Sequence, residues 1–126
     1  MKHFNNVWER WEDNSRRFPN KDAIVHWKAG EEPFRWSFQS LLDTANKFSV
    51  LLKEKGIKRD EVCAIIIRHN PLFFPLYLGV AGLGAIPAVL AYPNPAFTPI
   101  NLSQALKECR RDQGLIGYSP KVILNL

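Results

Sequence analysis

The stretch "NPLFFPLYLGVAGLGAIPAVLAY", residues 70–92, contains no charged residue and decides the fold of this chain. The 22 uncharged residues of range 71–92 are enough for a helix that crosses a bilayer. Pro75, Pro87 and three glycines interrupt the run, however, and divide it into a helix of about a dozen residues and a following strand. We therefore expect a buried helix and strand with no transmembrane span, and a membrane-associated protein that uses residues 71–92 remains the alternative.

The glycines of this stretch do not form a phosphate-binding loop. Gly79, Gly82 and Gly84 occur in the order GxxGxG and close a helix, whereas a nucleotide-binding loop follows a strand and opens a helix. Small residues at Gly79 and Gly82 allow the helix to lie close against a sheet, and Gly84 provides the stop.

The start of this helix has a strong signal and a conflicting one. Asn70 is placed to cap the helix and Pro71 to occupy its first position. Pro75 then falls near the fifth position, where it removes a backbone hydrogen bond. Either the first turn is distorted or the helix begins later than Pro71.

The neighbouring segments extend this unit into an α/β fold. The run "VCAIII", residues 62–67, is continuously apolar and rich in β-branched residues, which is typical of a strand buried on both faces of a parallel sheet. With the 71–83 helix and the strand "IPAVLA" it predicts a βαβ unit. We expect a three-layer α/β fold with a mostly parallel sheet, helices on both faces, an N-terminal helix and a β-hairpin.

The other predicted elements are a helix from Asn5 or Asn6 to Pro19, hairpin strands "AIVHWK" and "FRWSF", a helix over 37–56, a helix over 101–114, and strands "LIGYS" and "KVILNL".

Composition restricts the function classes. A chain of 126 residues that is 46% hydrophobic has the length of one domain, residues 1–126, and its net charge of +5 is spread along the sequence, unlike the basic strip of a nucleic-acid-binding protein. Cys63 and Cys109 lie in apolar surroundings and are expected to pack as small hydrophobic residues. His3, His26 and His69 lack the spacing of metal ligands. The first residues lack the features of a secretory signal, so we expect a cytoplasmic protein.

The order of these segments resembles the opening of the adenylate-forming ligases, the superfamily of acyl- and aryl-CoA synthetases, luciferases and peptide-synthetase adenylation domains. The resemblance covers residues 4–119 and consists of many weakly specific matches in register. The matching positions are Phe18, Pro19 and Ala23; Trp36, Ser37 and Phe38; Gly56, Ile57, Glu61, Cys63, Ala64 and Ile65; and Asn70, Phe74, Leu78, Gly79, Gly84 and Ala85. Asp60-Glu61 departs from the usual Gly-Asp pair of the superfamily, and Phe73 replaces a common acidic residue.

The resemblance implies an enzyme that activates a carboxylic acid, here a fatty or aryl acid, as an acyl-adenylate and transfers the acyl group to a thiol. ATP, Mg²⁺ and coenzyme A are implied for the full-length enzyme, and none is expected to be bound by this fragment. No catalytic, nucleotide-binding or metal position of the superfamily falls on this chain. The chain is therefore expected to be a structural, inactive N-terminal subdomain whose partner is the remainder of the parent ligase.

Some side chains remain candidates for the substrate side. Tyr92, Asn94 and Phe97 follow the strand "IPAVLA" in a proline-rich loop and are predicted to face the acyl-binding cleft. Trp8, Trp11, Trp27 and Trp36 are predicted to lie in the core because of their helical or alternating spacing. The other alternative is a free-standing, non-catalytic interaction module with the same fold.

Overall fold

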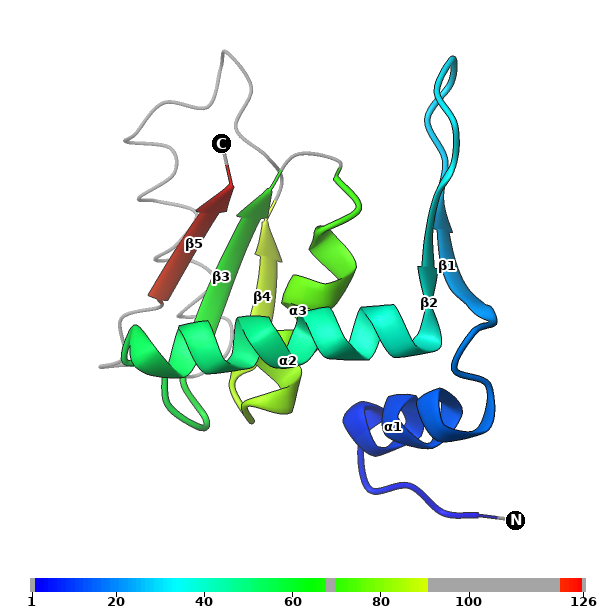
Figure 1. The fold of residues 1–126 in the computed structure, drawn as a ribbon. Coiled ribbons are helices and arrows are strands. Elements are labelled where there is room, and N and C mark those ends of the chain that lie inside the picture. Colours follow the sequence, from blue (N-terminus) through cyan, green and yellow to red (C-terminus); the bar gives the residue numbers. More distant parts are fainter. Residues whose placement is uncertain (1, 68–69, 91–120, 126) are drawn as a thin grey trace.

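The computed structural model describes residues 2–67, 70–90 and 121–125. Its elements, in order, are α1 (Val7–Arg17), β1 (Asp22–His26), β2 (Phe34–Ser37), α2 (Phe38–Glu54), β3 (Val62–Ile67), α3 (Phe73–Gly82), β4 (Ile86–Leu90) and β5 (Lys121–Asn125) (Figure 1). This sequence of elements confirms the predicted α/β fold class with its N-terminal helix and hairpin.

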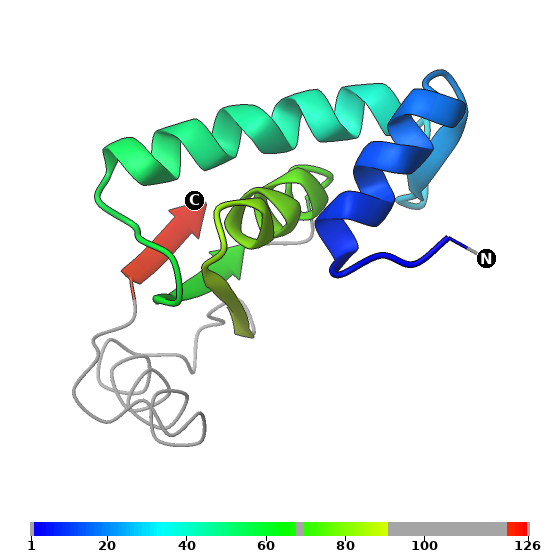
Figure 2. The same ribbon diagram turned by 90° about the horizontal axis from the view of Figure 1, so that it is seen from below.

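The predicted βαβ unit is the centre of the fold. Strand β3 lies between β4 and β5 and pairs with both in parallel. Cys63 and Ile65 of β3 pack in one core cluster with Leu52 of α2 and with Leu76 and Val80 of α3. Both helices therefore cover the same face of the sheet (Figure 2). The helix predicted over 101–114 lies outside the described residues.

The uncharged stretch divides into α3 and β4, as predicted. Within the described ranges 2–67, 70–90 and 121–125, no helix has the length and apolar character that a membrane crossing requires. The ten residues of α3 give a rise of about 15 Å, which is half of a bilayer core.

The predicted start of this helix at Pro71 is wrong by two residues. The Asn70 side chain accepts a hydrogen bond from the N–H of Leu72 at 2.8 Å, and its backbone carbonyl accepts from Phe73 at 3.0 Å. Asn70 therefore forms a turn before the helix and does not cap it. With the helix beginning at Phe73, Pro75 occupies the third position, where a backbone N–H has no partner within the helix. The later start removes the conflict that the sequence contained.

The partners of Gly79 and Gly82 also differ from the prediction. A Cβ atom at Gly79 would lie 2.8 Å from both the Ala45 carbonyl oxygen and the Phe48 Cβ atom of α2. One at Gly82 would lie 2.6 Å from the Trp8 ring of α1. These glycines therefore bring α3 close to two helices and not to the sheet. Gly84, with a φ of +83°, ends the segment as predicted.

A second cluster joins the N-terminal elements to the βαβ unit. Strands β1 and β2 pair in antiparallel fashion, which confirms the hairpin. Ser37 then begins α2, because its hydroxyl accepts from the N–H of Ser40 at 3.0 Å in a capping box. Trp36, Leu41, Ala45 and Leu78 form the buried part of this cluster, with Trp8 and Trp11 of α1 packed against it. The hairpin, α1 and α2 are thus attached to α3 through one apolar contact.

Asp13 is the charged side chain that orders α1. It is 5% exposed, and its carboxylate lies 2.6 Å from the Lys2 ammonium and 3.6 Å from each of the Arg16 and Arg17 guanidinium groups. The hydrogen bond from Lys2 lowers the pKa of Asp13 below its ordinary value of 3.8, and the nearby charges of Lys2, Arg17 and Arg16 act in the same direction against desolvation. The ionised carboxylate is therefore favoured in the folded state.

Replacing Gly79 tests the contact between α2 and α3. Helix propensity alone predicts that Gly79→Ala stabilises the protein by about 1 kcal/mol. The 2.8 Å approach to backbone and Cβ atoms of α2 instead predicts a net loss of about 1–3 kcal/mol in the free energy of unfolding. Urea unfolding followed by circular dichroism measures the difference. Gly30→Ala is the control, since a Cβ there meets no atom within 4 Å and only the φ of +81° is strained; a stabilising Gly79→Ala contradicts the close contact.

The lowered pKa of Asp13 predicts a pH-dependent contribution to stability. A carboxylate with a depressed folded-state pKa stabilises the fold above its unfolded-state value, and this contribution disappears as the pH falls through the folded-state pKa. Asp13→Asn should therefore be less stable than the parent chain at pH 6, and the gap should close below about pH 3.8. Thermal unfolding from pH 6 to pH 2 measures it, with the exposed Asp60→Asn as control. An equal gap at both ends of this range would rule out the proposed linkage.

Candidate functional site

The candidate site lies at the carboxyl ends of the parallel strands, where ligands bind in open α/β sheets. Strand β3 ends at Ile67, and β4 ends at Leu90, which lies opposite Ile66 in the register. The two ends therefore meet at one edge of the sheet. Tyr92, Asn94 and Phe97 follow β4 by two to seven residues but lie outside the described residues, so their substrate-side role remains a prediction.

Trp36 attaches the hairpin to this edge. Its indole N–H donates to the Pro71 carbonyl at 2.8 Å, and the side chain is 6% exposed. The Phe34 ring packs edge-on against it, with 5.0 Å between ring centroids. The backbone before α3 is therefore held by Trp36 from β2 and by the turn at Asn70. The sequence carried only a general signal for this contact, a tryptophan in an alternating strand.

A cavity of about 330 Å³ lies beside this contact. Its lining residues are His26, Lys28, Glu31, Glu32, Phe34, Asn70 and Pro71, which come from the hairpin and from the turn before α3. Lys28 and Glu31 form an ion pair of 3.0 Å within it. The sequence placed His26, Lys28 and Phe34 in the two hairpin strands and Glu31 and Glu32 in the loop between them, and nothing local in these segments indicates that they lie beside the turn before α3.

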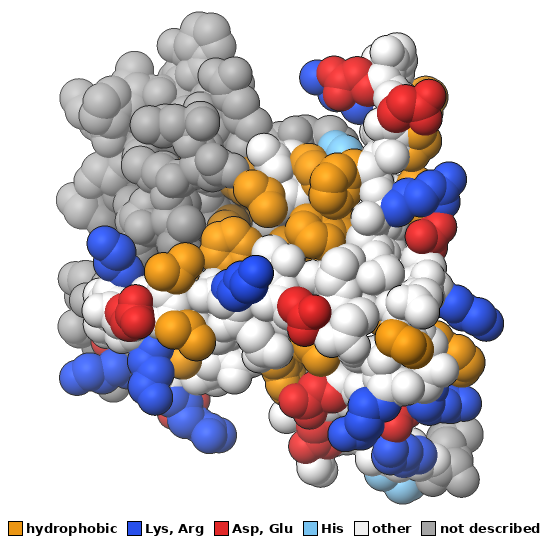
Figure 3. Space-filling view, viewed as in Figure 1, with side chains coloured by type: hydrophobic (Ala, Val, Ile, Leu, Met, Phe, Trp, Pro, Cys, Tyr) orange, Lys and Arg blue, Asp and Glu red, His pale blue; other side chains and the backbone are white. Residues whose placement is uncertain are grey.

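Apolar side chains are exposed around the same edge. Phe34 on β2, Leu72 before α3 and Tyr77 on α3 each keep more than a third of their surface exposed. Figure 3 shows hydrophobic side chains gathered on the front face between the hairpin and the sheet, above α2. Such an exposed apolar surface is suited to binding an apolar ligand or to being covered by another segment of the protein.

The tryptophans divide between core and surface. Trp36 is buried, and Trp8 and Trp11 are half-buried against the second cluster, which confirms the prediction for three of the four. The prediction for Trp27 is wrong, since this side chain is 65% exposed. Alternation along β1 places Ile24 and His26 inward, and therefore Val25 and Trp27 outward.

Cys63 has no reactive character. It is fully buried in the main core cluster, and desolvation, with the nearby Glu61 charge, raises the pKa of Cys63 to about 11. The thiol is therefore protonated at neutral pH and packs as a small hydrophobic residue, as predicted. Cys109 and His69 lie outside the described residues.

The two glycines of α3 do not form a phosphate-binding cradle. The space beside Gly79 and Gly82 is filled by Phe48 and Trp8, so neither glycine offers an open backbone cradle. In the part of the chain that the structure describes, no cluster of three His, Cys, Asp or Glu side chains is placed to hold a metal ion. This part of the chain supplies a supported edge and an apolar surface.

Comparison with known protein families shows to which family the chain belongs. The profile of the AMP-binding enzymes matches residues 11–115. The chain belongs to the AMP-binding enzyme family. This match confirms the resemblance to the adenylate-forming ligases.

Two curated relatives show how much of such a protein the chain represents. It is 29% identical over 106 residues to nonribosomal peptide synthetase 2 of Cochliobolus heterostrophus, covering 84% of this chain and 2% of that protein. It is 27% identical over 81 residues to crotonobetaine/carnitine–CoA ligase of Citrobacter koseri, covering 64% of this chain and 16% of that protein. The chain therefore spans a small fraction of the length of these relatives.

Solved structures of the same superfamily share the fold. A fatty acid AMP ligase from Legionella pneumophila matches with a TM-score of 0.74 and 15% identity, over 88% of this chain and 19% of that one. The N-terminal subdomain of Klebsiella oxytoca NpsA, in complex with anthranilyl-AMSN, matches with a TM-score of 0.73 and 16% identity. The match covers 97% of this chain and 31% of that one. The fold is therefore that of an N-terminal part of an adenylate-forming enzyme.

The buried thiol of Cys63 gives a test of the main core cluster, into which the amino end of β3 packs. In Cys109→Ser, which leaves Cys63 as the one cysteine, a pKa of about 11 makes roughly one thiol in a thousand a thiolate at pH 8. Alkylation by iodoacetamide should be slowed further by burial. We expect it to accelerate at least about 100-fold in denaturant, measured by mass spectrometry. Rapid native labelling, at the rate of a free peptide thiol, would contradict the buried position.

Proposed function

We propose that residues 1–126 are the N-terminal subdomain of a longer ATP-dependent ligase that activates a carboxylic acid through an acyl-adenylate. The observation that carries the proposal is membership of the AMP-binding enzyme family over residues 11–115. The 31% share of the NpsA subdomain that the chain covers supports a larger parent protein. In this proposal the remainder of the ligase is the partner of the chain, and the enzyme is cytoplasmic.

The reaction of such an enzyme proceeds in two displacements. A carboxylate oxygen of the acid attacks the α-phosphorus of ATP, forming the acyl–phosphate bond as the bond to pyrophosphate breaks. A thiol, in our proposal that of coenzyme A, then attacks the acyl carbon and AMP leaves. Both steps redistribute charge on phosphate oxygens, which requires Mg²⁺ and cationic or N–H donors. We assign these groups to the longer ligase.

The part of this chain in the reaction is positional. Trp36 holds the Pro71 carbonyl in the segment that follows β3, and the neighbouring strand β4 leads along the chain to the loop of Tyr92, Asn94 and Phe97. We propose that this loop lines the acyl side of the cleft. The exposed apolar surface around Leu72 and Tyr77 is compatible with a fatty or aryl acid.

The activation of an amino acid is a second candidate. The match to a nonribosomal peptide synthetase covers 84% of the chain, more than the 64% covered by the match to a CoA ligase. In that case the acceptor is a carrier-bound thiol in place of coenzyme A. A free-standing interaction module is the remaining rival, and it requires no chemistry.

Pyrophosphate exchange tests the proposed reaction. The product of the full reading frame that contains these residues should catalyse acid-dependent exchange of labelled pyrophosphate into ATP with one class in a panel of fatty, aryl and amino acids. The 126-residue chain alone should show none, because its described part provides no phosphate cradle or metal cluster.

The outcomes separate the alternatives. Exchange by the 126-residue chain alone contradicts its positional role. A longer product that is inactive with every acid in the panel contradicts the ligase. A reading frame that stops after Leu126 would favour the interaction module.

A further inference from the structure

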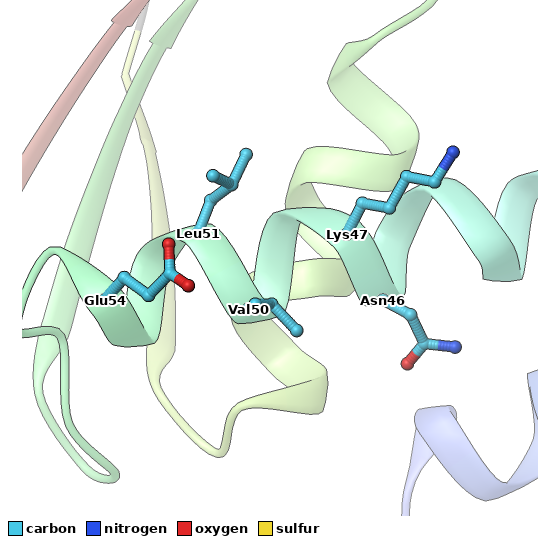
Figure 4. Close-up of a pocket in the computed structure, with 5 residues that line it drawn as sticks. All are labelled: Asn46, Lys47, Val50, Leu51 and Glu54. Carbon is cyan, nitrogen blue, oxygen red and sulfur yellow. The ribbon is translucent and has the colours of Figure 1, made fainter.

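The outward face of α2 carries an apolar pair that no described residue covers. Val50 is 57% exposed and Leu51 is 52% exposed, although both lie within a regular helix of 17 residues. Together with Asn46, Lys47 and Glu54 they form an open surface along α2 (Figure 4). In the close-up Lys47 and Leu51 rise above the helix and Asn46 and Val50 lie below it, so the surface spans a broad arc of α2.

The charges on this face lie on either side of the apolar pair, and they include the exposed Asp43, one turn before Lys47, whose carboxylate accepts from Gln39 at 2.8 Å. Lys47 lies one turn before the apolar pair and Glu54 lies one turn after it, so the pair is flanked symmetrically by opposite charges. Within the described part of the chain, neither side chain takes part in an ion pair, although six such pairs form elsewhere. The face thus has an unpaired cation and an unpaired anion with an apolar centre.

This arrangement is complementary to a copy of itself in the antiparallel direction. A two-fold axis between Val50 and Leu51 places Lys47 of one copy opposite Glu54 of the other, twice, and stacks Val50 on Leu51. A parallel pairing would instead place like charges opposite each other, which is unfavourable. For a second copy, the charge pattern therefore favours the antiparallel over the parallel direction.

We propose that a second copy of this chain docks on the α2 face through an antiparallel, two-fold symmetric helix pair. Helices with small or medium side chains at the contact approach to about 8–10 Å between axes. One helix pair buries less than about 1,200 Å² in total, the size of weak and transient complexes. The expected state is a reversible dimer that forms at high protein concentration.

Sedimentation velocity on the 126-residue chain tests this proposal. The parent chain should shift from monomer to dimer between about 10 µM and 1 mM, the range of a weak complex. Val50→Glu buries a charge at the centre and should weaken association at least about tenfold. A parent chain that stays monomeric over the whole range overturns the proposal.

A charge reversal tests the direction of pairing. Lys47→Glu places two carboxylates opposite each other and should weaken association about three- to tenfold. Adding Glu54→Lys restores opposite charges in the antiparallel pair and should return the affinity to within about twofold of the parent. Lys28→Glu, the same charge change on an exposed hairpin side chain, is the matched control and should have no effect. Failure of the double reversal to restore association overturns the proposal.

Cross-linking gives an independent test of the axis. In a Cys109→Ser background, Val50→Cys lies beside the axis and should form a disulfide-linked dimer under mild oxidation. Lys47→Cys should not, because its two copies are offset by about seven residues, or roughly 10 Å, beyond the reach of a disulfide. Circular dichroism confirms that each exposed substitution leaves the fold intact. Cross-linking at position 47 in preference to position 50 would overturn the antiparallel arrangement.

Discussion

The close approach of α3 to α2 at Gly79 is the contact on which the rest of the structure depends. The Ser49 side chain of α2 donates to the Gly79 carbonyl of α3 at 2.6 Å, at a point where a side chain on residue 79 would push the two helices apart. Because α3 lies against β3 and α2 carries the hairpin at its start, this contact determines where the hairpin meets the sheet. The Trp36 bond to Pro71 is formed only if that distance is kept.

The sequence predicted the elements whose signals are local. β3 and β4 followed from continuous apolar runs, and α2 from a clear amphipathic period with Ser37 before it. Gly84 was correct as a stop because a positive φ is a property of the residue and its own backbone. These signals need no knowledge of what the element packs against.

The errors concern partners and not elements. Gly79 and Gly82 indicated a close approach, but a glycine does not specify which surface approaches it, and here two helices do. Asn70 is a good cap in isolation, yet Pro75 permits an unstrained helix only from Phe73 onward. Trp27 was misassigned because alternating spacing does not say which face of the hairpin is buried, and Trp27, which follows β1, is exposed as Val25 is. The candidate edge was predictable from topology, whereas the contact between hairpin and turn was not.

Among the described strands, β4 is one edge of the parallel sheet, and its backbone groups are unevenly distributed. The N–H of Ile86 donates to the Glu61 carbonyl at 2.8 Å, so Ile86 and every second residue after it point their backbone groups toward β3. Pro87 therefore faces the other side, where it has no N–H to offer, and of the five β4 residues only Val89 presents a donor there. An added strand on this side would leave acceptors unmatched, which is costly. Pro87 therefore makes the outer side of β4 a poor template for a further strand.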